Sequence, residues 1–129
     1  MQGTLQVMLI DDEPIVGKRL KPAIEKKGYE VEAFTTGAEA LARLDEKTFD
    51  IVITDVRMDE IDGIEVMTRV KERSPHTRVI IITGYATIEM AHEALAKGAF
   101  DFIAKPFKPN DLRAVIERAA DSLRKSEGK

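Results

Sequence analysis

The sequence has no cysteine, no strong excess of either charge and no long apolar run. Without cysteine the chain cannot form a disulfide framework, a thiolate metal site or a cysteine nucleophile, which suits a reducing compartment. Its apolar runs fall far short of the roughly 20 residues that a membrane-spanning helix needs. Residues 1–4 lack the basic and apolar regions of a signal peptide. We therefore expect a cytoplasmic protein with no membrane partner.

The chain is also too short for a second domain. Its 129 residues match one ordinary domain, since domains typically contain about 100–150 residues. A content of 43% hydrophobic and 33% charged residues is that of a soluble globular protein. The net charge of −3 gives no basic footprint for nucleic acid. We predict one domain over residues 1–125, a frayed tail at 126–129 and no direct nucleic-acid binding.

Five apolar segments have the length and composition of β-strands. The central one, within residues 49–58, has a core of valine and isoleucine that ends in a single carboxylate, Asp55. Such a run is typical of a strand buried on both faces of a parallel sheet. The other predicted strands cover residues 5–10, 29–34, 79–83 and 100–104.

Five segments of helical periodicity alternate with these strands. Their starts are indicated by proline at a first helical position or by a capping side chain, at Pro14, Thr36, Asp62, Thr87 and Pro109. Gly28 and Gly98 are suited to end the first and fourth helices. Pro22 should kink the first helix, because it deletes a hydrogen bond to the carbonyl of Lys18.

This alternation predicts both the fold and the place of the functional site. Repeated βα units form a parallel sheet with right-handed crossovers and helices on both faces, a doubly wound α/β fold. Ligands of such folds bind beyond the carboxyl ends of the strands. The residues at those ends are Asp11, Asp12, Asp55, Thr83 and Lys105. We expect the chemistry at these side chains.

Short motifs at the strand ends, in this order and spacing, resemble the receiver domain of two-component response regulators. They are Asp11-Asp12-Glu13-Pro14, Asp55-Val56-Arg57-Met58, Asp62-Gly63, Thr83-Gly84, Gly98-Ala99 and Lys105-Pro106-Phe107. The resemblance covers nearly the whole chain and implies a flavodoxin-like (βα)5 fold with strand order 2-1-3-4-5. Several variants resemble receivers of enhancer-binding transcription activators, so the chain is either a single-domain regulator or the amino-terminal part of a longer one.

In that strand order the first and third strands are neighbours, and Asp11, Asp12 and Asp55 should converge. Three close carboxylates cannot all stay ionised unless a cation joins them. Mg²⁺ prefers oxygen ligands and is commonly held by one or two carboxylates with phosphate oxygens. The resemblance implies that Asp12 and Asp55 ligate Mg²⁺ directly, that Asp11 acts partly through water, and that the backbone carbonyl of Arg57 is another ligand.

The resemblance also implies the phosphoryl chemistry. Asp55 would accept a phosphoryl group from a sensor histidine kinase, a phosphotransfer protein or a small donor, since carboxylates do form aspartyl-phosphates. Lys105 would pair with Asp55 and then with a phosphoryl oxygen, and Thr83 would donate its hydroxyl to another. A cis peptide bond between Lys105 and Pro106 would aim Lys105 at Asp55. No turnover of an external substrate is expected.

In the family that this chain resembles, a pair of side chains changes conformation when the aspartate is phosphorylated. The resemblance points to Thr83 coupled with Phe102, with the change displayed by the fourth helix, fifth strand and fifth helix, a surface that could also form a homodimer. Arg57 and Tyr85 would lie at the rim of the phosphoryl site and slow its hydrolysis by hindering water.

Other positions are less typical of the family or carry no assigned role. Asp59 stands in place of the usual proline, which removes a φ constraint and adds negative charge near an acidic site. Lys108 precedes Pro109 where aspartate or threonine would be a better helix cap. His76 and His92 have no partner at ligand spacing and are interpreted as surface residues.

Three other classes share parts of the pattern. A dehalogenase-type phosphatase needs a second aspartate where this chain has Arg57. A flavodoxin-like electron carrier needs a hydroxyl- and glycine-rich phosphate loop, whereas Asp11, Asp12 and Glu13 would repel phosphate. A non-phosphorylated interaction module on the receiver fold stays open, because Asp59 is unusual.

Overall fold

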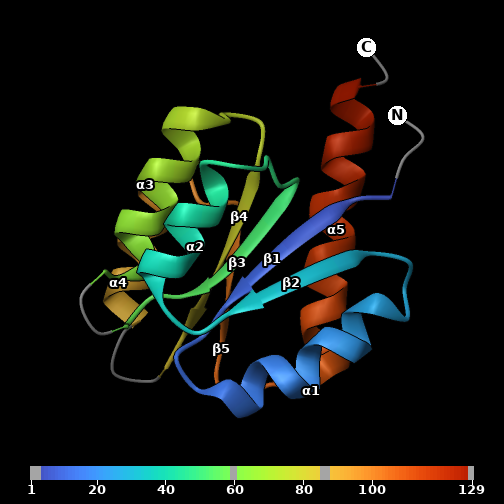
Figure 1. Ribbon diagram of the computed structural model, residues 1–129, viewed down its shortest axis with the longest axis horizontal. Coiled ribbons are helices and arrows are strands. Elements are labelled where there is room, and N and C mark those ends of the chain that lie inside the picture. Colours follow the sequence, from blue (N-terminus) through green and yellow to red (C-terminus); the bar gives the residue numbers. More distant parts are fainter. Residues whose placement is uncertain (1–3, 59–60, 85–87, 128–129) are drawn as a thin grey trace.

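Five parallel strands form one sheet with helices on both of its faces (Figure 1). The computed structural model describes residues 4–58, 61–84 and 88–127. Its strands are β1 (Gln6–Ile10), β2 (Glu30–Phe34), β3 (Ile51–Asp55), β4 (Arg78–Thr83) and β5 (Asp101–Ala104). Its helices are α1 (Pro14–Glu25), α2 (Gly37–Leu44), α3 (Gly63–Arg73), α4 (Ile88–Ala96) and α5 (Pro109–Glu127). The strand order β2-β1-β3-β4-β5 confirms the predicted doubly wound α/β topology.

Alternation along the strands divides the core into two layers. On β3, Ile51 and Ile53 face one side of the sheet and Val52 faces the other, since successive side chains of a strand point to opposite faces. Helices α1 and α5 cover the first face, with Leu20 and Ile116 in the core. Helices α2, α3 and α4 cover the second face. Every residue of β3 is buried, as its apolar run predicts.

Helix caps form at two of the predicted positions. Thr36 Oγ1 accepts the backbone N–H of Glu39 at 3.1 Å, and Asp62 Oδ1 accepts that of Glu65 at 2.9 Å. Each bond satisfies a donor of the first helical turn. The predicted cap at Thr87 lies outside the described residues.

Helix α5 is capped in a way that the sequence analysis did not foresee. The backbone N–H of Lys108 donates to Asp111 Oδ2 at 3.0 Å. Pro109 takes the first helical position, as predicted. The carboxylate of the third helical residue therefore satisfies the backbone N–H of Lys108, which is the half of a capping box that does not need a capping side chain at position 108.

Several predicted boundaries differ from the structure. Strands β1, β2 and β5 begin one residue later than predicted, and β4 begins one residue earlier. Leu5 is buried and its carbonyl accepts the N–H of Glu30, but the strand itself begins at the next residue. Helix α1 contains Pro22, as predicted, and ends at Glu25, before the predicted stop at Gly28; a kink at Pro22 stays a prediction. Helix α5 extends to Glu127 and so includes Ser126; the fraying of residues 126–129 stays a prediction.

None of the helices in the described part of the chain combines the length and the apolar character needed to cross a membrane. This agrees with the absence of a long apolar run from the sequence.

Candidate functional site

The sheet brings the predicted site residues to one edge. Strands β1 and β3 are parallel neighbours, so Asp11, which follows β1, lies beside Asp55, the last residue of β3. Strand β4 ends at Thr83, and Lys105 directly follows the neighbouring β5. The backbone N–H of Lys105 donates to the carbonyl of Thr83 at 2.7 Å, which holds the loop after β5 against β4.

Three carboxylates form an acidic cluster at this edge. Asp11, Asp12 and Asp55 each offer one oxygen, and these oxygens lie within 4.8 Å of one another. Asp11 is 2% exposed and Asp55 7% exposed, whereas Asp12 is open to solvent. The convergence predicted from the strand order is therefore present in the structure, with two buried members and one that solvent ligands can reach.

The pKa of the Asp11 carboxyl is raised in this cluster. Burial raises the pKa of its carboxyl, and the negative charge of Asp55 adds to the effect. The backbone N–H of Glu13, bonded to Oδ1 at 2.9 Å, and the ammonium of Lys105 act in the opposite direction. Oδ2 is buried, and among the described residues it accepts no hydrogen bond of good geometry, but it forms an ion pair with Lys105 Nζ at 3.2 Å. A bound cation would add a second positive partner for this oxygen.

Lys105 neutralises much of the cluster from the solvent side. Its Nζ donates to Asp55 Oδ2 at 3.0 Å and to Glu13 Oε1 at 3.1 Å. Burial by itself lowers the pKa of the ammonium, but the bonds to Asp55 and Glu13 and the charge of Asp11 outweigh burial and raise the pKa above its usual value. The peptide bond between Lys105 and Pro106 is cis, as the resemblance implies.

Thr83 and Phe102 lie on neighbouring strands but in different environments. Thr83 is fully buried, and its hydroxyl bonds the carbonyl of Gly84 at 3.0 Å. Phe102 is only half-buried, and its ring meets that of His92 on α4 edge to face, with the centroids 5.8 Å apart. Phe102 therefore packs between the core and the exposed side of α4 in this structure.

Of the two residues predicted at the rim of the phosphoryl site, Arg57 belongs to the described part of the chain. Arg57 is exposed, and its backbone N–H donates to Asp55 Oδ1 at 3.0 Å, which orients the carboxylate. Tyr85 and Asp59 lie outside the described residues.

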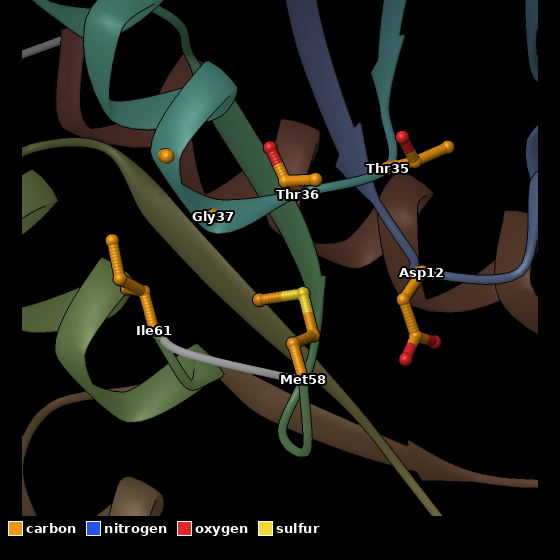
Figure 2. A pocket seen from close by; sticks show the side chains of 7 residues that line it. Asp12, Thr35, Thr36, Gly37, Met58 and Ile61 are labelled. Atoms are coloured by element: carbon orange, nitrogen blue, oxygen red, sulfur yellow. The ribbon is translucent and has the colours of Figure 1, made fainter.

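A hollow of about 190 Å³ opens beside the acidic cluster. It is lined by Asp12, Thr35, Thr36, Gly37, Ala38, Met58 and Ile61. In Figure 2 the side chains of Asp12 and Met58 lie below the turn that carries Thr35 and Thr36. Asp12 thus belongs both to the cluster and to the wall of this hollow.

Two contacts at the site were not predicted from the sequence. Glu13 binds Lys105, although it was assigned only to a matching motif, and His92 contacts Phe102, although it was interpreted as an ordinary surface residue. His92 is indeed exposed. The contact of Glu13 could have been predicted only from its place in the chain. Glu13 follows the two site aspartates Asp11 and Asp12, and its side chain is long enough to reach across the strand ends.

Known proteins resemble this chain over nearly its full length. The profile of the response regulator receiver domain matches residues 7–117. The regulatory protein AtoC of Escherichia coli (strain K12) is 36% identical over 119 residues, which cover 92% of this chain and 26% of AtoC. The transcriptional regulatory protein ZraR of Salmonella typhimurium (strain LT2) is 33% identical over 126 residues, covering 98% of this chain and 29% of ZraR. The chain therefore spans about a quarter of the length of these relatives.

A solved structure gives the same result for the fold. The crystal structure of a response regulator receiver domain protein from Clostridium thermocellum superimposes with a TM-score of 0.88 at 31% identity. The match covers 97% of this chain and 99% of that one.

Proposed function

The chain belongs to the response regulator receiver domain family of two-component systems, and we propose that its Asp55 accepts a phosphoryl group from a sensor histidine kinase or a phosphotransfer protein. One observation carries this proposal: three acidic oxygens lie within 4.8 Å of one another, and the ammonium of Lys105 lies 3.0 Å from Asp55. Charge neutralisation around a single positioned carboxylate is what phosphoryl transfer requires.

In the proposed reaction Asp55 is the nucleophile. One of its oxygens forms a bond to phosphorus while the bond from phosphorus to the donor breaks, and the donor keeps that electron pair. The backbone N–H of Arg57 holds Oδ1, and Lys105 faces Oδ2. Lys105 and, after leaving the carbonyl of Gly84, the hydroxyl of Thr83 would donate to phosphoryl oxygens. The protein is then a phosphoacceptor that releases its own phosphate slowly, not an enzyme that turns over an external substrate.

The donor set fits Mg²⁺. Asp11 Oδ2 is buried with the ammonium of Lys105 at 3.2 Å but with no well-formed hydrogen bond from the residues that the structure describes, and burial disfavours the charge of Asp11. Asp11, Asp12, Asp55 and the backbone carbonyl of Arg57 would hold the ion, and all four donors are the hard oxygens that Mg²⁺ prefers. When bound, the ion neutralises charge on the phosphoryl oxygens. Asp12 is exposed, so the cluster is open to the ion from solvent.

We propose that phosphorylation changes the surface made by α4, β5 and α5, and that this surface is the one a partner recognises. Phe102 would couple this face to Thr83; it lies half-buried on β5, the neighbour of β4, and contacts His92 of α4. Movement of the Thr83 hydroxyl toward a phosphoryl group would free space for the ring of Phe102. A partner or a second copy of the chain would read the change on that face. Arg57 and Tyr85 are proposed to slow hydrolysis by hindering water at the rim.

The test is covalent modification by acetyl phosphate in the presence of Mg²⁺. Intact mass and peptide mapping should show one phosphate on the peptide that contains Asp55, and none in Asp55→Asn. Asp121 is an exposed aspartate on α5, and Asp121→Asn is therefore the matched control. This variant should be modified like the wild type. An unmodified wild type would favour the non-phosphorylated interaction module, and an adduct in Asp55→Asn would refute the assignment of Asp55.

A further inference from the structure

Among the residues that the structure describes, Glu13 is the one ion-pair partner of the Lys105 ammonium that lies outside the acidic cluster. The ammonium contacts Asp55 Oδ2 at 3.0 Å, Glu13 Oε1 at 3.1 Å and Asp11 Oδ2 at 3.2 Å. Asp11 and Asp55 belong to the cluster, but Glu13 does not. Its side chain is 62% exposed, whereas that of Lys105 is 29% exposed. Glu13 is therefore the most exposed of the three acids that contact the ammonium.

Hydrogen bonds to neighbouring residues fix the backbone of Glu13. Glu13 directly precedes α1, and its extended backbone is followed by Pro14 at the first helical position. Its own N–H is bonded to Asp11 Oδ1 at 2.9 Å, and its carbonyl accepts the N–H of Val16 at 3.0 Å. The side chain makes no capping bond to the helix. The carboxylate is therefore not engaged in capping α1.

An ammonium has three N–H donors, and in this structure it faces three carboxylates. Any cation that takes Asp11 Oδ2 competes with Lys105 for that oxygen. Once Asp55 carries a phosphoryl group, the N–H of Lys105 that donates to Asp55 Oδ2 in this structure would donate to a phosphoryl oxygen instead. Of the three acids that contact Lys105, Glu13 alone is neither a member of the cluster that would hold a cation nor the proposed phosphoacceptor.

We propose that Glu13 is a positioning residue, which holds the ammonium of Lys105 at the mouth of the acidic cluster so that it stays directed at the phosphoryl site. This inference rests on the proposed function of Asp55. Glu13 also has an opposing effect, because its negative charge repels an anionic donor. Positioning and repulsion predict opposite changes when the charge is removed, so the sign of the effect distinguishes them.

The first test is the rate of phosphorylation by acetyl phosphate at saturating Mg²⁺, measured by intact mass. Glu13→Ala should slow the reaction by about two- to fivefold, the range expected for one exposed ion pair. Glu13→Gln keeps a hydrogen-bond acceptor and should lie between Glu13→Ala and the wild type. Glu46→Ala is the matched control, since Glu46 is 68% exposed and pairs with Arg43 at 3.1 Å, and it should react like the wild type.

The second test asks whether Glu13 acts through Lys105. In a Lys105→Ala background, which reacts slowly, Glu13→Ala should cause no further loss, because coupled residues are not additive. An equal loss in both backgrounds would overturn the proposal, as would an unchanged or faster reaction of Glu13→Ala in the wild-type background. The latter result would show that repulsion dominates or that the pair has no effect.

The third test needs no phosphorylation or metal. Reductive methylation by formaldehyde in metal-free buffer, followed by peptide mapping, reports how freely the Lys105 amine meets reagent. Glu13→Ala should raise its modification about two- to fivefold relative to exposed Lys125, an internal standard. Unchanged modification would overturn the positioning role. Failure of the proposed function is distinct from this result, since the wild type would then not be phosphorylated at all.

Discussion

Gly63, the first residue of α3, packs directly against the backbone of Asp55. A Cβ on Gly63 would overlap the carbonyl oxygen of Asp55 and lie 2.8 Å from Cα of Val56. The N–H of Gly63 also donates to the carbonyl of Val56 at 3.0 Å. The start of α3 therefore supports the end of β3, where the proposed phosphoacceptor is located, and only a residue without a side chain fits there.

Gly63→Ala should destabilise the protein, because both atoms in the way are backbone atoms that cannot move aside. The expected loss is about 3 kcal/mol in the free energy of unfolding, measured with urea, as for overpacking of a rigid core. Gly84→Ala is the control, since a Cβ there meets nothing within 4 Å, and its stability should stay within about 0.5 kcal/mol of the wild type. Equal stability of the two variants would contradict this account of Gly63.

Asp11→Asn should stabilise the metal-free protein. The substitution removes a charge that burial disfavours and leaves an oxygen that can accept the N–H of Glu13. The variant also loses the 3.2 Å ion pair with Lys105, but that pair is partly exposed and contributes no more than about 1 kcal/mol, so a net gain of about 1 kcal/mol is expected from relief of the buried charge. The same change should abolish most of the stabilisation by Mg²⁺ that mass action gives the wild type. Urea titrations with and without Mg²⁺ would check both effects, and a destabilised Asp11→Asn would contradict the argument.

The strand ends were predictable because their signals are local. The apolar run before Asp55 indicates a buried strand, and a carboxylate that directly follows a buried strand lies at the edge of the sheet. Thr36 and Asp62 cap their helices for equally local reasons. Features that depend on a few consecutive residues can be read without tertiary information.

Contacts between distant segments were not predictable in the same way. Lys105 and Asp55 are 50 positions apart, and only the family resemblance suggested their pairing. The edge-to-face contact of His92 with Phe102 depends on how α4 lies across β5. Arg78 lies outside the apolar run predicted as a strand over residues 79–83, yet it begins β4, and its guanidinium bonds Ser122 of α5 at 2.8 Å, a partner that the local sequence does not reveal.

A pH-dependent contribution to stability is expected from Glu32. Arg43 binds this carboxylate through Nε at 2.8 Å, and Lys47 adds a bond at 3.0 Å, which together lower its pKa from 4.5 to about 2. A carboxyl whose pKa falls on folding stabilises the native state above its unfolded pKa and loses that contribution as the pH falls through its folded pKa. The window is therefore pH 4.5 to about 2.

Comparison of the wild type with Glu32→Gln should reveal this window. Because the side chain is 32% exposed, the difference in unfolding free energy above pH 4.5 should be no more than about 1 kcal/mol. It should then shrink toward zero as the pH approaches 2. Glu30→Gln is the control on the same strand, because Glu30 binds the neutral amide of Gln6. A difference that did not change with pH would show that packing, not charge, connects Glu32 to its partners.

The edge-to-face contact between His92 and Phe102 should hold Phe102 in its present half-buried position. The ring centroids are 5.8 Å apart at an interplanar angle of 62°, and aromatic pairs in such geometry contribute about 0.5–1.5 kcal/mol. If Phe102 moves inward on activation, this contact must break. His92→Ala removes it beforehand and should favour the activated state. Beryllofluoride, a phosphoryl mimic, should then act at a concentration about two- to fivefold lower, which corresponds to the lower part of that energy range.

The measurement is a titration of the Mg²⁺-saturated protein with beryllofluoride, followed through NMR signals of selectively labelled phenylalanine. His76→Ala is the control, because His76 is also an exposed histidine but lies in the loop before β4. Its midpoint should equal that of the wild type. A midpoint of His92→Ala that is unchanged or shifted to higher concentration would mean that the contact does not restrain the switch. In that case the half-buried position of Phe102 would have to be held by the core residues beneath its ring.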